Sequence, residues 1–116
     1  MIRKAAEFDK EVVPEMCGGS GDVVLHYALH DKDTRSKICA CCTVTLAKGA
    51  SVGKHQHTED DEIYYILRGK GSVDEGDGRR VPVEPGDVIL TGNGGFHDMK
   101  NEGDEPLVFL ATVVAY

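Results

Sequence analysis

The sequence predicts an all-β fold, either an antiparallel sandwich or a small barrel, and three observations support this. Apolar and polar residues alternate over short segments, as they do in strands that bury one face. Fourteen glycines and four prolines separate these segments, and no helical period continues beyond the opening residues. The 116 residues contain no internal repeat or low-complexity linker, so residues 1–116 are expected to form one domain.

The expected elements follow one another with tight turns between them. Residues 1–16 could hold a turn or two of helix, which would end before Pro14. The turn EGDG at residues 75–78 joins the segments on either side of it as a hairpin. The expected strands are residues 22–30, 37–47, 51–57, 62–67, 69–74, 79–83, 88–91, 96–101 and 107–114.

Composition and charge exclude several classes of protein. The chain has 13 Lys and Arg against 20 Asp and Glu, a net charge of −7, so nucleic acid is not an expected partner. The longest apolar stretch, residues 107–116, is half of the ~20 residues that a membrane helix needs, and no membrane association is expected. The N-terminal residues contain no apolar segment of a signal peptide, which predicts a cytoplasmic location.

The four cysteines lack the spacing of a structural zinc site. Cys39, Cys41 and Cys42 form a C-x-C-C pattern rather than C-x2-C. On a strand, Cys39 and Cys41 share one face and Cys42 takes the other, so the three cannot converge on one ion. We interpret all four, Cys17 included, as reduced residues that pack like small apolar side chains. The alternative is that Cys39 or Cys41 faces a ligand pocket.

Two histidines and a glutamate form a candidate metal-binding pattern. His55 and His57 stand at i and i+2 of an expected strand, so their rings leave the same face about 6.6 Å apart along the backbone. Glu62 follows a turn that returns the chain beside that strand, and His97 is the candidate for a third imidazole. Imidazoles with one carboxylate suit a divalent ion such as zinc, iron, manganese or nickel.

The same residues resemble the two motifs of the cupin family. The first motif, G-x5-H-x-H-x4-E-x6-G, is matched by Gly49, His55, His57, Glu62 and Gly69. The second, G-x5-P-x-G-x2-H-x3-N, is matched by Gly86, Gly94, His97 and Asn101, while Gly92 stands where the pattern usually has proline.

The resemblance implies a jelly-roll β-barrel with one metal ion inside. Carried over position by position, the metal ligands are His55, His57, Glu62 and His97, and Asn101 is a structural position. The motif glycines would allow positive φ angles and close turns. Small bacterial cupins of this kind include oxalate-decarboxylase-like proteins. The alternative is a barrel in which the motif persists without a working metal.

Several further residues have two interpretations. Tyr64 shares a face with Glu62 and Met99 shares one with His97, so both either line a substrate pocket or belong to the barrel core. His26 and His30 lie outside both motifs and are interpreted as surface or interface residues. The acidic residues Glu59, Asp60 and Asp61 form either a solvated loop or a group that attracts cations to the site.

These residues predict a metal-dependent enzyme that acts on a small oxygen-rich metabolite: a carboxylate, enol or sugar-like molecule that chelates the metal. A lyase, a dioxygenase and an isomerase all remain open, and no catalytic residue is assigned. The alternative is a non-catalytic module that senses or buffers a ligand or metal. Oxalate decarboxylation of the cupin type relies on an arginine near the metal and on a lid. Because Arg68 lies about 20 Å along the strand from Glu62 and no lid is evident, that reaction is not predicted.

A homodimer is also expected. Residues 22–30 are apolar on both faces for much of their length, and a strand of this kind at an open sheet edge would invite pairing. The prediction is that this segment packs on the other subunit.

Overall fold

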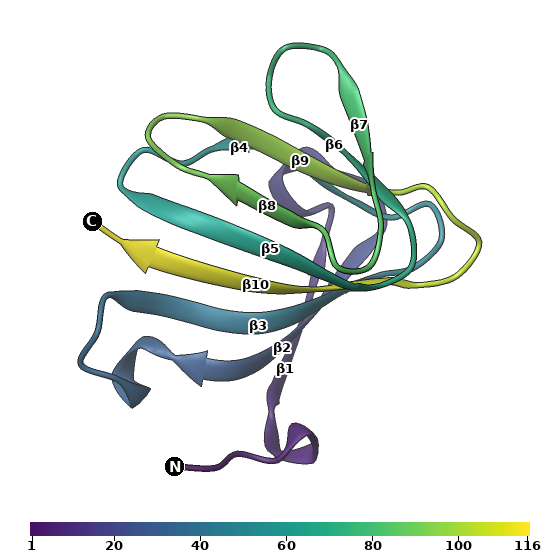
Figure 1. The fold of residues 1–116 in the computed structure, drawn as a ribbon. Coiled ribbons are helices and arrows are strands. Elements are labelled where there is room, and N and C mark those ends of the chain that lie inside the picture. The colour runs from purple at the N-terminus through teal and green to yellow at the C-terminus, as the bar shows by residue number, and fades with distance from the viewer.

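The computed structural model describes residues 1–116, whose strands form two antiparallel sheets that face each other (Figure 1). One sheet has six strands in the order β1-β2-β3-β10-β5-β8, and the other has four in the order β4-β9-β6-β7. The strands are β1 (Asp9–Pro14), β2 (Asp22–His30), β3 (Ile38–Leu46), β4 (Ser51–Gln56), β5 (Asp60–Arg68), β6 (Gly71–Asp74), β7 (Arg80–Val83), β8 (Val88–Thr91), β9 (Phe96–Asn101) and β10 (Leu107–Ala115). Three single 3-10 turns complete the fold: η1 (Ala5–Glu7), η2 (Met16–Gly18) and η3 (Asp31–Asp33).

The all-β prediction is confirmed, and each expected strand is present with bounds that differ by two residues at most. The expected hairpin around residues 75–78 joins β6 to β7, which pair antiparallel. None of the helical turns has the length or the apolar character needed to cross a bilayer.

The predicted N-terminal helical turn is present as η1, but the sequence analysis missed a strand. Residues 9–14 form strand β1, which pairs with β2 over six residues. Val12 and Val13 are β-branched and favour the extended chain. Pro14 is tolerated because β1 is an edge strand, where a missing N–H breaks no ladder. Consequently residues 22–30 are paired on both sides and are not the open edge that the dimer prediction assumed.

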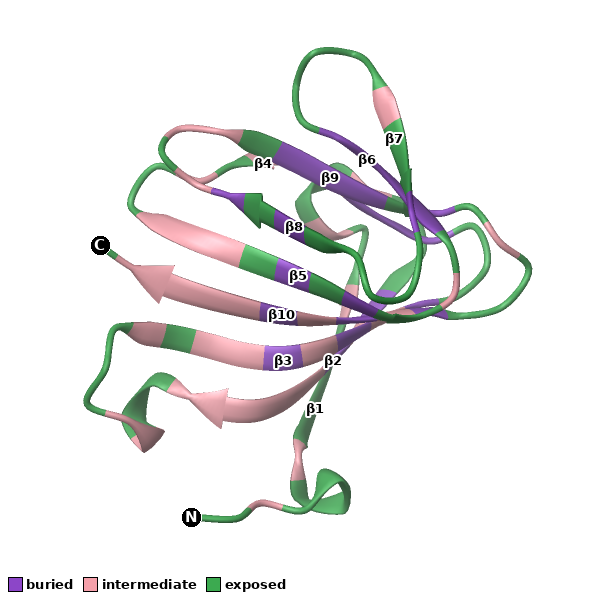
Figure 2. Ribbon diagram, in the orientation of Figure 1, coloured by how far each residue is buried: buried purple, intermediate pink, exposed green.

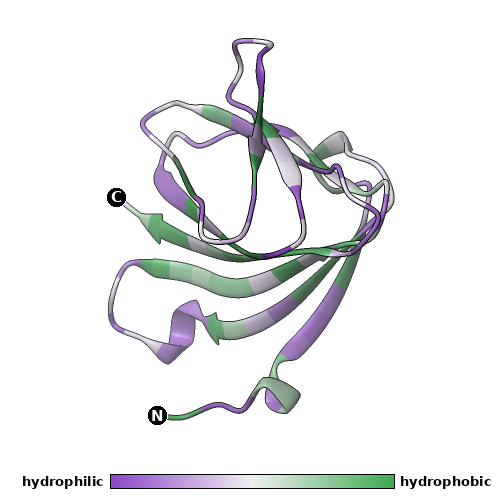
Figure 3. Ribbon diagram, turned by 45° about the vertical axis from the view of Figure 1, so that its right-hand side comes forward, coloured by the Kyte–Doolittle hydropathy of each residue, from purple (hydrophilic) through white to green (hydrophobic).

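The hydrophobic core lies between the two sheets, where the buried parts of the strands face each other (Figure 2). β10, which ends at the C-terminus, is mostly hydrophobic in Figure 3 and lies in the middle of the six-stranded sheet. The largest fully buried side chains include Phe109 and Leu46. By contrast, five of the six residues of β1 are exposed.

The register of the six-stranded sheet aligns its inward-facing residues in rows. Tyr27, Cys42, Ala111 and Tyr64 lie opposite one another on β2, β3, β10 and β5. A neighbouring row contains Ala40 on β3, Val113 on β10 and Glu62 on β5. Side chains in a row touch across the strands, so these two rows form one continuous wall.

The turn η2 packs directly on β4 and covers one side of the barrel interior. The carbonyl of Cys17 lies so close to Gly53 that a Cβ atom at Gly53 would overlap it. Glycine at this position therefore lets η2 approach the strand that leads to the first two site histidines.

Candidate metal site

The four-stranded sheet positions three histidines at one point. His55 on β4 lies directly opposite His97 on β9, and the register of this pair shifts between Val52 and His55. Such irregularities redirect side chains near functional sites. His57 follows the last residue of β4, and its backbone N–H donates to the carbonyl of Gly95 at 3.0 Å. The loop before β9 thus holds His57 beside His97.

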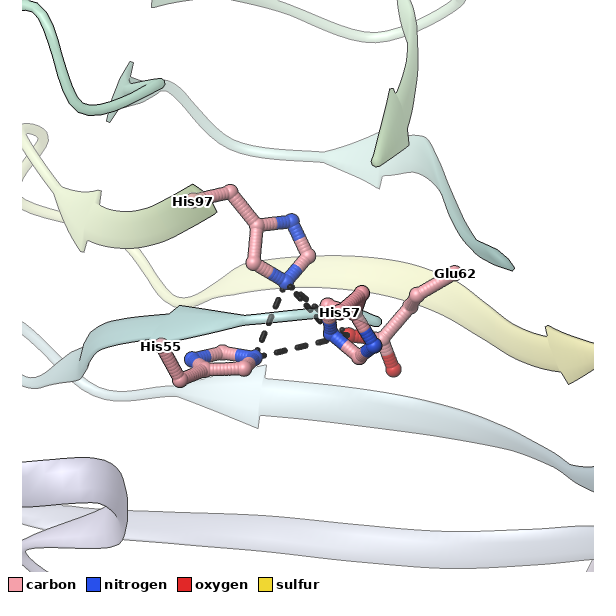
Figure 4. A group of neighbouring side chains, drawn as sticks. All are labelled: His55, His57, Glu62 and His97. Carbon is pink, nitrogen blue, oxygen red and sulfur yellow. Dashed lines mark hydrogen bonds and ion pairs between the residues drawn. The ribbon is translucent and has the colours of Figure 1, made fainter. Parts of the chain in front are cut away.

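The six-stranded sheet supplies the carboxylate. Glu62 lies on β5 opposite Thr91 of β8 and Val113 of β10, and its side chain is 12% exposed. Figure 4 shows the three imidazoles and this carboxylate pointing toward one another. One ligand atom from each of His55, His57, Glu62 and His97 lies within 4.8 Å of the others. The structure therefore brings together the residues that the motif spacing singled out.

The spacing of these atoms fits a single transition-metal ion. The Nε2 atom of His97 lies 2.9 Å from Nε2 of His55 and 3.2 Å from Nε2 of His57. The Oε1 atom of Glu62 lies 3.1 Å from Nε2 of His97, 3.2 Å from Nε2 of His57 and 3.7 Å from Nε2 of His55. Ligands bound at about 2.1 Å and at right angles would be about 3 Å apart.

The other ring nitrogens determine which tautomers are present. Nδ1 of His55 donates to the carbonyl of Gly53 at 2.8 Å, and Nδ1 of His57 donates to the carboxylate of Asp60 at 2.6 Å. Both acceptors can only accept, so the neutral rings have lone pairs on Nε2. Lone pairs that face each other at such distances need a proton or a cation between them. The donor set thus fits a metal ion, and Asp60 orients one ligand.

His97 is the most buried of the three histidines, and its environment differs from that of the others. Its Nδ1 lies 2.8 Å from the hydroxyl of Thr91, and its ring stacks on Tyr64 with 4.6 Å between centroids. Burial lowers the pKa of His97, which favours the neutral ring that binds metals. The role of Thr91 was missed, because nothing in the sequence shows that β8 pairs with β5 and brings this hydroxyl to the ring.

Glu62 is ionised in this arrangement. Burial by itself would raise the pKa of this carboxyl, but hydrogen bonds from His55 and His97 outweigh burial and lower it to about 2. The partner effect on His55 has the opposite sign: the hydrogen bond to Glu62 raises the pKa of His55. Without a metal, protons can therefore replace the cation between the imidazoles and the carboxylate.

A cavity of about 270 Å³ adjoins this group, and the two predicted pocket residues differ in their relation to it. Tyr64 lines the cavity, next to Glu62. Met99 is fully buried in the core, near Gly71, and is not part of the lining. Tyr64 also belongs to the buried core, so it combines both positions weighed for it, whereas Met99 belongs to the core alone.

The cysteines that face the cavity are not the ones considered from the sequence. All four are free; Cys39 is exposed, and Cys41 accepts a hydrogen bond from Thr112 at 3.5 Å. The lining contains Cys42 instead, because the inward face of β3 carries its even-numbered residues. Cys17, which lies on η2, is also in the lining. Burial raises the pKa of Cys42 to about 12 and also raises that of Cys17, so both thiols are protonated at neutral pH.

The acidic turn before Glu62 has specific contacts that neither of its two interpretations included. Asp60 holds His57, as described, and Asp61 accepts a hydrogen bond from the hydroxyl of Tyr116 at 2.6 Å. The same hydroxyl accepts the backbone N–H of Asn93, also at 2.6 Å. Tyr116 thus connects the loop that carries His57 to the loop that leads to His97.

The departure from the second motif has a structural explanation. A Cβ atom at position 92 would overlap the carboxylate of Asp61 and crowd the hydroxyl of Tyr116. Glycine at this position therefore makes room for the hydrogen bond between these two residues. A proline at Gly92, as the usual motif has, is incompatible with it.

The remaining motif and histidine predictions agree with the structure. Asn101 donates to the carbonyls of Leu46 and Glu105 at 3.0 and 2.8 Å, which makes it a structural residue. His30 pairs with Asp9 at 3.0 Å, and neither it nor His26 belongs to the metal-site group. The motif glycines Gly69 and Gly94 have positive φ angles of 86° and 83°.

Known proteins resemble this chain in both fold and sequence. The family model of the cupin domain matches residues 42–113 of the sequence. An oxalate-binding protein from Thermotoga maritima is 36% identical over 114 residues, which cover 98% of this chain and 93% of the relative. A glucose-6-phosphate isomerase from Thermococcus onnurineus is 33% identical over 116 residues, which cover 89% of this chain but 60% of the isomerase.

A solved structure gives the same result in three dimensions. The crystal structure of a predicted oxalate decarboxylase from Thermotoga maritima has a TM-score of 0.94 and 34% identity, with 100% of both chains covered. Since the family model matches more than half of the residues and includes all four members of the metal-site group, this chain belongs to the cupin family.

Proposed function

We propose that the protein holds one divalent transition-metal ion (manganese, iron, zinc or nickel) on His55, His57, Glu62 and His97. The observation that supports this is the convergence of three Nε2 atoms and one carboxylate oxygen. In addition, hydrogen bonds from Nδ1 to an acceptor fix the orientation of two of the three rings, His55 and His57. Four protein ligands leave about two positions of an octahedral ion for other molecules. When bound, such an ion acts as a Lewis acid or, if it is iron or manganese, exchanges an electron.

We further propose a metal-dependent enzyme whose substrate is a small oxygen-rich metabolite that reaches the ion through the adjoining cavity. The names of the relatives support a small carboxylate or sugar-like ligand, since one binds oxalate and another isomerises a sugar phosphate. In this scheme Glu62 and the histidines hold the ion, and the apolar lining excludes water from the bound molecule. The free thiols agree with the expected cytoplasmic location.

A non-catalytic binding module is the second candidate, and the composition of the cavity favours it. Apart from the proposed metal ligands, the lining contains no Asp, Glu, Lys, Arg or His side chain that could transfer a proton near neutral pH. Arg68 lies near the other end of β5, is exposed, and is not in the lining. An enzyme should show metal-dependent turnover in a panel of small carboxylates and sugars. A module should show only thermal shifts that saturate with ligand.

The test of the metal site is elemental analysis of the untagged protein, together with the double variant His55→Ala/His57→Ala. We expect about one ion per chain in the wild type and almost none in the double variant. The matched control is His26→Ala/His30→Ala, which removes two histidines outside the site and should keep the ion. Absence of metal from the wild type after incubation with manganese, iron, nickel and zinc would contradict the proposal.

A homodimer remains part of the proposal, with a different edge from the one first considered. β1 is one of the two edge strands of the six-stranded sheet, with β8 at the other edge, and Val12 on β1 is 48% exposed. An unpaired edge of this kind invites a strand from a second copy. Light scattering at micromolar concentration should give the mass of two chains, and a monomer mass would contradict the dimer.

A further inference from the structure

The wall of the cavity is apolar except at the proposed metal ligands. β2, β3, β4, β5, β10 and η2 all contribute to it, and no lysine or arginine is among its residues. The lining consists of Met16, Cys17, Leu25, Tyr27, Ala40, Cys42, Val44, Val52, His55, His57, Glu62, Tyr64, Ala111 and Val113. A ligand that enters this space therefore meets aliphatic side chains, thiols and the rings of Tyr27 and Tyr64 on every side except the one that faces the histidines and Glu62.

Small residues create the space beside the metal-site group. Ala111 on β10 lies opposite Tyr64 on β5. In the neighbouring row, Val113 on β10 lies between Glu62 on β5 and Ala40 on β3. Larger side chains at the two alanines would project into the region next to Glu62. The volume of about 270 Å³ is close to the lower end of the roughly 300–1,000 Å³ of pockets that hold drug-sized ligands, so it exceeds what a two-carbon ligand fills.

The charge of the site restricts the charge of the ligand. A divalent ion with the ionised Glu62 would carry one net positive charge inside the barrel. Asp60 lies behind His57 with 30% of its side chain exposed, outside the lining, so water screens its charge. A chelating monoanion would bring the buried charge to zero. A dianion would leave one uncompensated negative charge against apolar walls, and burial penalises such a charge.

On the basis of the proposed metal site, we propose that the cavity selects a monoanionic 2-oxo acid with a branched aliphatic or aromatic substituent. The carboxylate and oxo oxygens would face the histidines and Glu62, and the substituent would fill the space beside Ala40 and Ala111. The dianion oxalate offers no apolar part to this wall. A sugar phosphate would place its phosphate where no cationic side chain is available.

The experiment uses protein loaded with one Co²⁺ per chain, whose visible absorption responds to new ligands. Pyruvate, 4-methyl-2-oxopentanoate and oxalate are titrated, and each affinity is divided by the affinity of that ligand for aqueous Co²⁺ in the same buffer. We expect this affinity ratio to be at least tenfold higher for 4-methyl-2-oxopentanoate than for pyruvate, because its three additional carbons leave water on binding. The ratio for oxalate should be lower than both.

The variant Ala40→Leu tests whether the wall is responsible. It should remove most of the advantage of 4-methyl-2-oxopentanoate while the affinity for pyruvate changes less than twofold. Ala6→Leu adds the same atoms to the exposed turn η1 and should leave all three affinities unchanged. Equal affinities for the two monoanions in the wild type, or a preference for oxalate, would overturn the inference.

Failure of the underlying metal site gives a different result. If the wild type binds no Co²⁺, the metal proposal itself fails. If Co²⁺ binds and loses its protein spectrum in His55→Ala/His57→Ala, but none of the three ligands changes the wild-type absorption, the metal site stands and the inference about the ligand class is wrong.

Discussion

The two sheets contribute to the site in different ways. The four-stranded sheet, with the loop that follows β4, carries three histidines whose nitrogens converge; the six-stranded sheet carries Glu62 and most of the apolar wall. The histidines come from two neighbouring strands, so their positions depend on local register. The part of the wall on the six-stranded sheet is assembled from four strands spread from residue 22 to residue 115. We infer that the first sheet supplies most of the metal affinity, with Glu62 and Asp60 of the second, and that the second sheet determines most of the stability and the ligand choice.

The largest expected effect concerns the core of the six-stranded sheet. Phe109 is fully buried and packs against Tyr64 with 4.5 Å between ring centroids. Phe109→Ala should lower the free energy of unfolding of the metal-free protein by about 3–5 kcal/mol, measured by urea denaturation. Leu110→Ala, on the partly exposed opposite face of the same strand, should cost much less. Similar losses in both variants would contradict the assignment of the main core to the inward face of this sheet.

The pH dependence of the metal-free protein tests the contact between the sheets. The pKa of Glu62 is about 2 in the folded protein against an ordinary 4.5, so its stabilisation is complete above pH 4.5 and is lost as the pH falls toward 2. The difference corresponds to about 3 kcal/mol. The raised pKa of His55 acts in the opposite sense, since its contribution is complete below pH 6.5 and is lost as the pH rises through the raised value.

The combined contribution of Glu62 and His55 to stability should therefore be greatest between pH 4.5 and 6.5. His97 acts in the other sense: its pKa is lowered, so its contribution is complete above pH 6.5 and is lost as the pH falls through the lowered value. Urea unfolding at pH 3 and pH 5 measures the acid side. In Glu62→Gln the decrease in the free energy of unfolding between these two pH values should shrink by about 2 kcal/mol, because part of the stabilisation by Glu62 persists at pH 3 when its folded pKa is about 2. An unchanged decrease in that variant would assign the acid sensitivity to other carboxylates.

Asp60 tests whether metal affinity depends on the orientation of His57. Asp60→Ala removes the acceptor of Nδ1 and should weaken metal binding about 10- to 100-fold, with little change in the stability of the metal-free protein. Glu59→Ala removes the same charge from the neighbouring exposed position. If both variants weaken binding equally in a competition titration with a chelator, long-range attraction of cations rather than orientation is the cause.

The smallest effect is expected from Tyr116. Tyr116→Phe removes the hydroxyl that connects Asp61 to Asn93 and should cost about 1 kcal/mol of stability, with faster release of the metal to a chelator. Tyr65→Phe, at an exposed position on β5, serves as the control. Identical release rates in the two variants would mean that the link between the loops does not support the site.

The convergence of the metal-site side chains could be predicted where it depends on spacing along one strand or across one turn. His55 and His57 share a face because side chains alternate along an extended chain, and the turn after them returns Glu62 to the same place. The prediction failed for residues 9–14, because a short segment with two valines can form helix or strand until a partner strand is known. The alternative weighed for the cysteines placed Cys39 or Cys41 at a pocket, whereas Cys42 lines the cavity, since alternation separates two faces without showing which is inside.

The sequence by itself determined the fold class, the four residues of the metal-site group and the structural position of Asn101. The fold class follows from alternation, and the resemblance to the two cupin motifs implied the full residue group and Asn101. Only the tertiary structure decided that Thr91 and Asp60 contact the site histidines, that Gly92 makes room for Asp61 and Tyr116, and that the wall is apolar. These features depend on the register between strands that are distant along the chain. Many local residue patterns are compatible with several registers, and packing of the whole barrel selects one of them.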